Sequence, residues 1–512
     1  MAPATGVPPR SRGMMDNRVE ASERDAGPVD AGGPARPALT AGVTVVGEAD
    51  YFAVTARGLE VVAGRELEAL GARNVLVTKG GAKFQGDKAL LYRANLWLRS
   101  VSRILKPLRE FAAANEEMLY AQTRRVRWED ILSPTKTIAV YATQDAADKR
   151  NSPPPRPGSA GPGGLGRGRE MRGSFRQGGR GAPPARGFAG RGPGGRGPAT
   201  GGAVPAGLNT QFLALKVKDA ICDRMRREVG SRPNVDTVTP QFRIHAHFSG
   251  GRCSLSLDSS GISLHERGYR MSQVPATLKE TLAAGLLMLA GYDGTQPLWD
   301  PMCGSGTIAV EAALMALRIA PGQFRSSFAF YEWPDFDGKL WTEILQDVRA
   351  QRRESLAQPI FVSDVNENAV HASQINAKQA GVEEQLKFFT ADATQAPPPC
   401  PAPGLMVLNP PYAERMGSEE NVTALYQALG ANWKAHYEGW KIAMFTGNLA
   451  AARQMPLEAG GKYVLNNGPL SCRLLMFEPG MEPVALPTSS DEGGEGTIPE
   501  TDVPAIDESE ST

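Results

Sequence analysis

LWDPMCGSGTIAVEAALMALRI (298–319) joins a short apolar segment, a glycine-containing turn and a long apolar segment. Asp300 closes the first segment, and Gly304 and Gly306 permit a tight turn with close backbone approach before a helix begins. The turn lacks both the GxxxxGK[ST] pattern of a Walker loop and the GxGxxG pattern of a dinucleotide site. The stretch therefore predicts a strand, turn and helix that bind neither a nucleoside triphosphate nor a dinucleotide in those ways.

The chain after residue 276 repeats this alternation. Short apolar strands are predicted at LWD, FVSD, LKFFTAD, LMVLN and KIAMFTG. Helical stretches such as IAVEAALMALRI and ENAVHASQINAKQAG separate them. Such alternation is typical of a parallel sheet with helices on both faces. We therefore predict a doubly wound, mostly parallel α/β fold for this region.

Three of these strands end in an aspartate, at Asp300, Asp364 and Asp392. In an open parallel sheet, ligands bind beyond the carboxyl ends of the strands. The Asp364 carboxylate can accept two hydrogen bonds from ribose hydroxyls, and Asp392 is positioned to bind an exocyclic amine. An ordinary helix cap or turn is the alternative role for each aspartate alone. Together, the three favour an adenosyl ligand without a pyrophosphate.

A fourth strand runs into LMVLNPPYAERMG (405–417). Because a residue before proline is held in extended geometry, Asn409 and Pro410 are kept out of the helical region. The Asn409 side-chain oxygen and the Pro410 carbonyl can then accept both hydrogens of a planar amine, and Tyr412 offers a face to its ring. These hydrogen bonds favour the rehybridisation that lets an aromatic amine attack an electrophile. An ordinary turn is the alternative interpretation of NPPY.

The region before residue 276 has a different, α+β pattern. Helices are predicted at LLYRANLWLRSVSRILK, near RRVRWEDIL, and at FLALKVKDAICDRMRREVG, with a strand at TKTIAVYAT and a hairpin at RIHAHFSGGRCSLSLD. A block of Gly, Pro and Arg separates the TKTIAVYAT strand from the last helix and the hairpin. Because that strand lacks partners until the hairpin, we interpret the block as an insertion within one domain.

Several of these motifs resemble those of known families. DPMCGSGT, SDVNENA, the aspartate of TAD and NPPY resemble motifs of class I S-adenosylmethionine-dependent methyltransferases that act on exocyclic amines. TARGLEVV, KVKDAICD, RPNVD and HERGYR resemble a ferredoxin-like segment followed by a THUMP domain. Over roughly residues 50 to 480, the chain resembles the bacterial THUMP-containing 23S ribosomal RNA guanine-N2 methyltransferases.

This resemblance implies a fold and a reaction. The fold would be a Rossmann-like class I methyltransferase with a seven-stranded, mostly parallel sheet, preceded by an α+β ferredoxin-like and THUMP region. The reaction would transfer the sulfonium methyl of S-adenosylmethionine to guanine N2 in 23S ribosomal RNA or its assembly intermediate. Some relatives carry a second methyltransferase domain, whereas the acidic end of this chain predicts none.

The resemblance also implies residue roles. The target guanine would be held by Asn409, Pro410, Pro411 and Tyr412. The methionine and adenosine cleft would be lined by Asp300, Cys303, Gly304 and Gly306, the ribose would be bound by Asp364, and the adenine by Asp392. Weaker candidates for RNA contacts are basic residues, for which a solvated surface is the alternative: Lys216, Lys218, Arg224, Arg227, Arg267, Arg270 and Arg415.

The resemblance and composition together divide the chain into five segments. The expected bounds are 1–48 for an N-terminal extension, 49–110 for the ferredoxin-like segment, 111–270 for the THUMP domain with an insertion at 148–208, 271–480 for the methyltransferase domain, and 481–512 for a tail. The extension, insertion and tail are predicted to be disordered because their composition cannot bury a core.

The formal net charge of +1 hides an uneven distribution. Residues 151–207 contain nine Arg and one Glu, whereas residues 481–512 contain nine acidic residues and no Lys or Arg. The RG repeats of the basic block can form a salt-sensitive RNA tether, and an insertion without function is the alternative. The rest of the chain is nearly neutral, so any further nucleic-acid surface must be local.

Cysteine spacing and hydropathy point to the cytoplasm. The five cysteines form no CxxC pair, so we expect free thiols and no metal site. The chain has no run of 18 apolar residues and no apolar signal-peptide region, and we expect no membrane partner.

Two other functions remain open at this point. A transfer-RNA guanine-N2 methyltransferase would have the same cleft motifs, because THUMP domains also serve that substrate. A non-catalytic RNA-binding or ribosome-assembly factor would keep the RNA-binding half without turnover. A DNA adenine methyltransferase shares NPPY, but the THUMP-like half argues against a DNA substrate.

Overall fold

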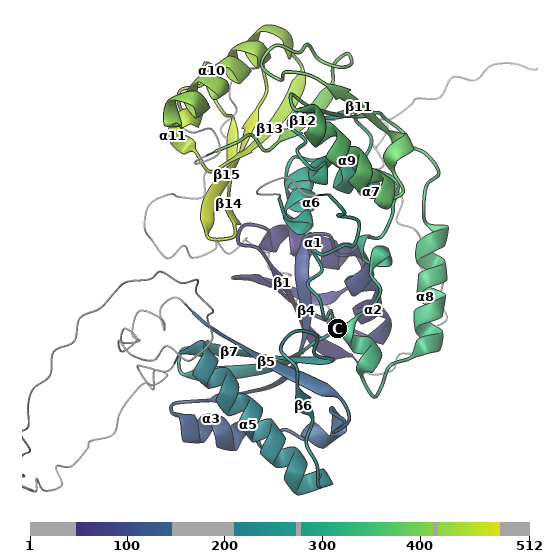
Figure 1. The fold of residues 1–512 in the computed structure, drawn as a ribbon, viewed down its shortest axis with the longest axis vertical. Coiled ribbons are helices and arrows are strands. Elements are labelled where there is room, and N and C mark those ends of the chain that lie inside the picture. Colours follow the sequence, from purple (N-terminus) through teal and green to yellow (C-terminus); the bar gives the residue numbers. More distant parts are fainter. Residues whose placement is uncertain (1–47, 146–208, 273–277, 413–417, 482–512) are drawn as a thin grey trace, which may run out of the picture. The chain divides into compact units, whose positions relative to one another are not determined.

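The computed structural model describes residues 48–145, 209–272, 278–412 and 418–481. These residues form two sheets, one of eight strands and one of seven (Figure 1). The three segments predicted to be disordered lie outside the described residues, apart from Glu48 and Met481 at their ends. No helix in the described part of the chain combines the length and apolar character needed to cross a membrane.

The first sheet contains strands from both N-terminal segments, in the order β2-β3-β1-β4-β8-β7-β5-β6. Its strands are β1 (Ala49–Thr55), β2 (Arg73–Thr78), β3 (Gly81–Gly86), β4 (Val101–Ala112), β5 (Thr137–Gln144), β6 (Asn234–Val235), β7 (Phe242–Ser249) and β8 (Arg252–Asp258). The accompanying helices are α1 (Glu60–Ala69), α2 (Lys88–Trp97), α3 (Glu116–Thr123), η1 (Trp128–Asp130) and α5 (Thr210–Val229).

Strand β5 pairs with strands on the far side of the Gly, Pro and Arg block. It pairs in parallel with β6 and β7, and both of these strands follow the block in sequence. The hairpin of β7 and β8 forms as predicted, and β8 pairs with β4. The strand before the block therefore completes its hydrogen bonding only with strands after it.

One helix prediction in this region is wrong, and a second is met only by a short 3-10 turn. LLYRANLWLRSVSRILK was expected to be one helix, but α2 ends at Trp97 and β4 begins at Val101. Leu98 has extended backbone, and the chain beyond it gains ladder partners on β1 and β8 that outweigh local helical preference. Near RRVRWEDIL only the short η1 turn forms, with the Trp128 indole buried and donating to the Thr123 carbonyl at 2.9 Å.

The second sheet has the order β11-β10-β9-β12-β13-β15-β14. Its strands are β9 (Leu298–Asp300), β10 (Ile360–Asp364), β11 (Leu386–Thr390), β12 (Gly404–Leu408), β13 (Trp440–Thr446), β14 (Gly461–Asn467) and β15 (Leu470–Phe477). Strands β9 to β13 are parallel, while β15 runs antiparallel to β13 and β14. This arrangement confirms the predicted mostly parallel, seven-stranded sheet, although the apolar pattern had not located the β14–β15 hairpin.

Helices cover both faces of this sheet. They are α6 (Glu280–Leu289), α7 (Thr307–Ala316), α9 (Glu367–Gln379), α10 (Glu419–His436) and α11 (Leu449–Ala452), with the short turn η4 (Glu383–Gln385). The connection between α7 and β10 also contains η2 (Pro321–Phe324), η3 (Ala329–Glu332) and α8 (Gly338–Ala350), which contact α2 and β7 beside the first sheet instead. Strand β12 shows the two-sided burial: Leu405 and Val407 pack into the core of α6 and α7, while Met406 and Leu408 pack with α10.

Candidate active site at the strand ends

The sheet register brings four of the predicted positions to one edge. Asp300 is the last residue of β9, and Asp364 is the last residue of β10. Asp392 and Asn409 follow the ends of β11 and β12. Because β9 pairs with β10 and β12, and β10 also pairs with β11, these residues lie at the carboxyl edge of four neighbouring strands.

Asp300 is a buried carboxylate whose two oxygens lack a hydrogen-bonding partner of normal geometry among the described residues. The residue is 1% exposed. Burial raises the pKa of Asp300 well above its usual range, the negative charge of Asp364 raises it further, and the nearby Met302 backbone amide offsets part of this shift. A buried polar group without a partner is costly, so Asp300 fits a site completed by a donor on a ligand.

The glycine turn between β9 and α7 has the backbone that its sequence predicts. Gly304 and Gly306 have φ values of 53° and 78°, in the left-handed region that favours glycine. A Cβ atom on Gly306 would lie 2.6 Å from the Ser373 Cβ of α9. The turn is therefore constrained both by its own conformation and by close packing of the neighbouring helix.

Asp364 and Asp392 organise their own loops. Asp364 accepts hydrogen bonds from the Gly304 and Asn366 backbone amides, each at 3.0 Å. Asp392 accepts from the Thr394 amide at 2.9 Å and hydroxyl at 2.7 Å, and from Gln395 Nε2 at 3.2 Å. The turn role left open by the sequence is thus present at both positions, while ribose and adenine contacts remain proposals.

Cys303 forms part of the wall of the glycine turn. Its thiol is buried, and Sγ lies 3.8 Å from both Ser373 Oγ and the Gly304 carbonyl oxygen. Burial raises the pKa of Cys303 far above its usual range, and the charges of Asp300 and Asp364 add to the shift. The thiol stays protonated at neutral pH, which suits a packing role rather than nucleophilic chemistry.

The NPPY segment presents a buried acceptor. Asn409 Oδ1 is buried and accepts no hydrogen bond from the described residues. Behind it, the Tyr426 hydroxyl lies 3.4 Å from the Pro411 carbonyl and 2.8 Å from Thr446 Oγ1. These contacts support the backbone beside Asn409, whose side-chain oxygen is left for a ligand.

Tyr412 differs from the expectation of an open stacking face. The residue is 7% exposed, and its hydroxyl accepts a hydrogen bond from Asn467 Nδ2 at 2.9 Å. A Cβ atom on Gly447 would lie 3.0 Å from Tyr412 Cδ2, so backbone passes close to the ring. Most of the ring is therefore covered, and stacking against a guanine remains a prediction.

Asn376 is a site residue that sequence reasoning missed. Its Oδ1 accepts from the Met271 and Ser272 backbone amides at 2.8 and 2.9 Å, and its Nδ2 donates to the Ser272 and Ser305 carbonyls at 2.8 and 2.9 Å. Asn376 thus ties the glycine turn to the segment before α6. The signal available in the sequence was an asparagine inside a helix, a position where this residue is unfavourable unless its side chain has a partner.

Arg267 was predicted to contact RNA, but its side chain lies in the interior of the protein. It is 1% exposed, and its guanidinium bonds to the Leu264 and Arg99 carbonyls and approaches Glu311 at 3.5 Å. Such burial excludes a contact with RNA. Arg270 is also turned inward, donating to Glu280 at 3.0 Å and to the Leu278 carbonyl at 2.9 Å.

The basic residues of α5 all have acidic neighbours. Arg224 has a side chain only 14% exposed and donates to Glu129 and to the Arg124 carbonyl, so it joins elements within the fold. Lys216, Lys218 and Arg227 are more exposed and lie beside Glu116, Asp219 and Glu228, respectively. Among the described residues, these three are therefore the predicted RNA contacts that stay on the surface. Arg415 and the RG repeats lie outside the described residues.

Protein-family comparisons match three parts of the chain. Residues 50–105 match the RlmL ferredoxin-like domain, residues 206–258 match the THUMP domain, and residues 267–476 match the RMKL-like methyltransferase domain. A Synechocystis protein provisionally named RNA methyltransferase slr0064 is 36% identical over 428 residues, which cover 84% of this chain and 96% of the relative. The chain belongs to the RMKL-like methyltransferase family.

Other members of the RMKL-like family are longer. The ribosomal RNA large subunit methyltransferase K/L of Syntrophotalea carbinolica is 35% identical over 437 residues, covering 84% of this chain. The chain spans about half, 53%, of that relative's length. The solved structure of SMU.472, bound to SAH, has a TM-score of 0.67 and 24% identity, covering 86% of this chain and 100% of that one, which supports the shared fold.

Membership in the RMKL-like family confirms two predictions. The cofactor is S-adenosylmethionine, and the partner class is RNA. The buried acceptors on Asp300 and Asn409 fit these assignments, because both the cofactor and an amino-bearing base bring N–H donors.

Proposed function

We propose that this protein transfers a methyl group from S-adenosylmethionine to the exocyclic N2 amine of a guanine in 23S ribosomal RNA. The observation that carries the proposal is the pair of unsatisfied buried acceptors, on Asp300 and Asn409, at the ends of neighbouring strands. Relatives named as ribosomal RNA large subunit methyltransferases favour the large-subunit RNA as substrate.

The cofactor side of the site would be formed by the ends of β9, β10 and β11. Asp300, Cys303 and the glycine turn would hold the methionine and adenosine parts, while Asp364 and Asp392 would reach the ribose and adenine. When bound, S-adenosylmethionine supplies an electrophilic methyl group. Asp364 also accepts the Gly304 amide, so ribose binding and the shape of the turn would depend on the same carboxylate.

The target side of the site is the NPPY segment. Asn409 Oδ1 and the Pro410 carbonyl would accept the two hydrogens of the guanine amine and localise the nitrogen lone pair for attack. No base needs to remove a proton first, because the proton can leave to solvent after transfer. Holding both reactants in one orientation can supply on the order of 7 to 11 kcal/mol of the barrier reduction.

The target base must leave its stack to reach this edge, at a cost of a few kcal/mol. This cost is smallest in RNA loops, bulges and assembly intermediates, because their bases are already unstacked. We therefore expect better turnover on deproteinised or partly assembled large-subunit RNA than on the mature subunit.

The test is methyl transfer from labelled S-adenosylmethionine to RNA from a strain lacking this protein. The RNA is separated into ribosomal and transfer fractions and digested to nucleosides. We expect label in N2-methylguanosine from the large ribosomal RNA. Label in transfer RNA would mean that transfer RNA, and not ribosomal RNA, is the substrate. Label in a different nucleoside would mean that the target base is not guanine N2. Absence of label from both RNA fractions and from precursor particles would contradict the proposed activity.

A further inference from the structure

The β14–β15 hairpin extends beyond the carboxyl edge of the second sheet. Because β15 is antiparallel to β13, its first residues lie at the carboxyl end of β13. The outermost pair of these two strands joins Arg473 to Thr446, the last residue of β13. Strand β15 begins earlier, at Leu470, and β14 ends opposite it at Asn467. Residues 466–470, here called the hairpin tip, therefore project past the edge where the candidate active site lies.

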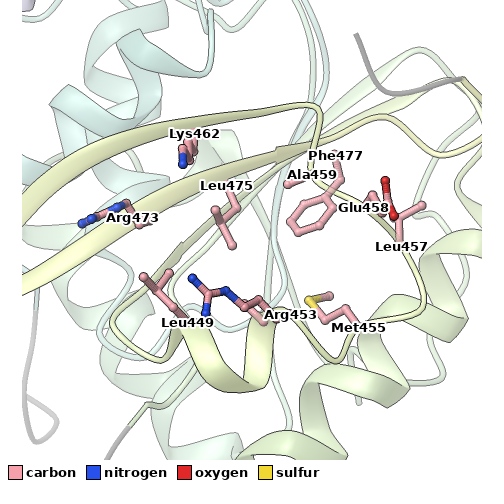
Figure 2. A pocket seen from close by; sticks show the side chains of 11 residues that line it. Leu449, Arg453, Met455, Leu457, Glu458, Ala459, Lys462, Arg473, Leu475 and Phe477 are labelled. Carbon is pink, nitrogen blue, oxygen red and sulfur yellow. The ribbon is translucent and has the colours of Figure 1, made fainter. Parts of the chain in front are cut away.

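The two faces of this hairpin have different surroundings. On one face, Leu475 and Phe477 line a pocket together with residues of α11 and the turn after it (Figure 2). Cys472 and Leu474 project from the other face and pack in the same core as the Tyr412 ring. The second face is thus the one that meets the target side of the active site.

Leu470 continues the row of Cys472 and Leu474 past the edge of the sheet. Those two residues are fully buried, whereas Leu470 is 52% exposed. Leu470 is paired with Asn467, whose Nδ2 donates to the Tyr412 hydroxyl at 2.9 Å. Since paired residues of an antiparallel ladder project from the same face, Leu470 lies on the side of the hairpin that faces Tyr412. The hairpin tip thus presents an apolar side chain to solvent beside the target side.

The turn between β1 and α1 contacts the hairpin tip. The Asn466 amide donates to the Arg57 carbonyl at 3.3 Å. A Cβ atom on Gly58 would lie 2.1 Å from the Val464 carbonyl oxygen and 2.8 Å from Leu465 Cδ2. The two backbones therefore touch at this point, which brings a turn of the ferredoxin-like segment to the carboxyl edge of the second sheet.

Buried groups fix this turn and leave one cation on its surface. Leu59 is fully buried in the core of the second sheet, and a Cβ atom on Gly285 of α6 would lie 2.6 Å from Leu59 Cδ1. Glu60 accepts hydrogen bonds from two backbone amides, one in this turn and one between β2 and β3, at 2.6 and 3.2 Å. Arg57 is exposed, and its side chain forms no ion pair with the described residues. Its guanidinium is thus held beside the hairpin tip by a well-packed turn.

The order of the strands places the hairpin tip on the substrate side of the site. The residues proposed above for the cofactor follow β9, β10 and β11, whereas Asn409 follows β12. Strands β13, β15 and β14 lie beyond β12, on the side away from β10 and β11. An RNA chain whose guanine is bound at Asn409 therefore extends over the hairpin tip, because the cofactor occupies the opposite side.

We infer that Arg57 and Leu470 bind a nucleotide of the substrate RNA that flanks the target guanine. The inference rests on the proposed function, because it takes Asn409 as the binding site of that guanine. Leu470 packs against the flanking base, and the Arg57 guanidinium pairs with a phosphate. An unstacked nucleotide offers both groups, an apolar base face and phosphate oxygens that match the geometry of a guanidinium. The ferredoxin-like segment thereby positions RNA at the active site directly.

The first test removes the cation. Arg57→Ala is compared with Arg65→Ala, which removes an exposed arginine of α1 that also forms no ion pair within the described residues. Binding of large-subunit ribosomal RNA is measured over a range of salt concentrations. We expect Arg57→Ala to weaken binding about tenfold and to reduce the slope of log affinity against log salt by about one, while Arg65→Ala changes neither. Arg57→Lys should restore most of the slope, because it restores the charge.

Thermal unfolding and S-adenosylmethionine affinity are measured on the same variants. Both should be unchanged in Arg57→Ala, because an exposed side chain without partners in the described structure supports neither. Equal weakening of RNA binding by Arg57→Ala and Arg65→Ala, or an unchanged salt slope, would overturn the phosphate contact. A loss of stability and cofactor affinity equal to the loss of RNA affinity would assign Arg57 a structural role instead.

The second test does not depend on charge. Leu470 is replaced by the photoreactive residue 4-benzoylphenylalanine in the full chain, which is irradiated with large-subunit ribosomal RNA. The control carries the same replacement at Leu76 of β2, which is 59% exposed. We expect the Leu470 variant alone to crosslink within a few nucleotides of the methylated base. A crosslink only to protein, or the same RNA crosslinks from both variants, would contradict the inference.

Methyl transfer by the unmodified protein is measured on the same RNA, so that the two proposals fail separately. Formation of N2-methylguanosine without an RNA crosslink from position 470 overturns the RNA contact and leaves the proposed reaction standing. A crosslink from position 470 to one site in the RNA, without N2-methylguanosine, supports the RNA contact and contradicts the proposed reaction.

Discussion

Asp300 combines a functional position with a cost to stability. Its carboxylate is buried, has no hydrogen-bonding partner of normal geometry among the described residues, and interacts with the negative charge of Asp364, so its pKa is raised in the folded protein. An acid with a raised folded-state pKa favours folding when protonated and opposes it when ionised. The cofactor-free protein should therefore lose stability as the pH rises from the unfolded pKa of an aspartate through the raised pKa of Asp300.

The variant Asp300→Asn tests whether Asp300 lowers stability while it contributes to cofactor binding. It should stabilise the cofactor-free protein at pH 7, and the gain should shrink as the pH falls and Asp300 becomes protonated. S-adenosylmethionine affinity should fall by about 10- to 100-fold, the loss expected for a hydrogen bond to a charged group. Thermal unfolding at several pH values and calorimetry measure the two effects. Asp392→Asn is the control, because Asp392 already has internal partners and should bring no gain in stability.

Asn409→Ala should separate catalysis from cofactor binding. Removing the acceptor for the target amine should lower kcat by about 10²- to 10³-fold, the usual effect of losing one preorganised transition-state hydrogen bond. The dissociation constant of S-adenosylmethionine should change little. Asn409→Asp keeps an acceptor oxygen and should retain more turnover than Asn409→Ala. Equal losses in turnover and cofactor affinity would instead assign Asn409 to the cofactor cleft.

The positions of site residues could be predicted where these residues directly follow a strand in the sequence. Asp300, Asp364, Asp392 and Asn409 each follow an apolar strand directly, so their shared edge could be inferred from the alternation of elements. Asn376 could not be found this way, because its partners lie 71 to 105 residues away in sequence. The burial of Tyr412 was equally hidden, since it depends on a hairpin residue, Asn467.

At the scale of elements, α7 and α9 meet at a glycine. A Cβ atom on Gly306 would overlap Ser373 of α9, whereas a Cβ atom on Gly381, just after α9, would meet nothing within 4 Å. Both glycines have positive φ, 78° and 67°, so alanine costs about 1 to 2 kcal/mol of backbone strain at either position. The two substitutions differ in the steric clash.

Gly306→Ala should therefore destabilise the protein more than Gly381→Ala and should also weaken S-adenosylmethionine binding by at least tenfold. The physical reason is that α9 must move away from the start of α7, which displaces Asn376 and the glycine turn together. Chemical denaturation and calorimetry on both variants provide the comparison. Equal losses of stability and cofactor affinity in the two variants would contradict a role for the close packing of Gly306 against Ser373.

The misassigned segment after α2 shows why some elements were not predictable. Its apolar residues fit a helical period, and the change to a strand at Val101 depends on pairing with β1 and β8. Strand β8 lies about 150 residues further along the chain, so the sequence around Val101 does not indicate this pairing. Pro107 was the one local warning, because proline is excluded from helix interiors and tolerated at irregular strand positions such as this register shift.

At the scale of the whole molecule, one sheet spans the expected boundary at residue 110. Strand β4 from the expected ferredoxin-like segment pairs with β8 from the expected THUMP segment. The two expected segments are therefore joined by backbone hydrogen bonds between β4 and β8. The parallel β5–β7 pair is equally important, because it connects the chain on either side of the basic insertion.

Deletion of residues 151–207 tests the role of that insertion. The described chain resumes at Asn209, just before α5, and β5 ends at Gln144, so a short Gly and Ser linker can preserve both flanking elements. Removing nine Arg and one Glu should weaken RNA binding several-fold at low salt and reduce the slope of affinity against salt. The methylated position should not change, because the cleft residues lie on a separate sheet.

Binding to large-subunit RNA at low and moderate salt, with mapping of the modified nucleotide, provides the measurement. A linker of equal length that keeps the glycines and replaces each Arg by Gln separates charge from length. If charge acts as a tether, this variant should match the deletion. Unaltered affinity at both salt concentrations would mean that the insertion contributes nothing to RNA capture and that RNA contacts come from the folded surface alone.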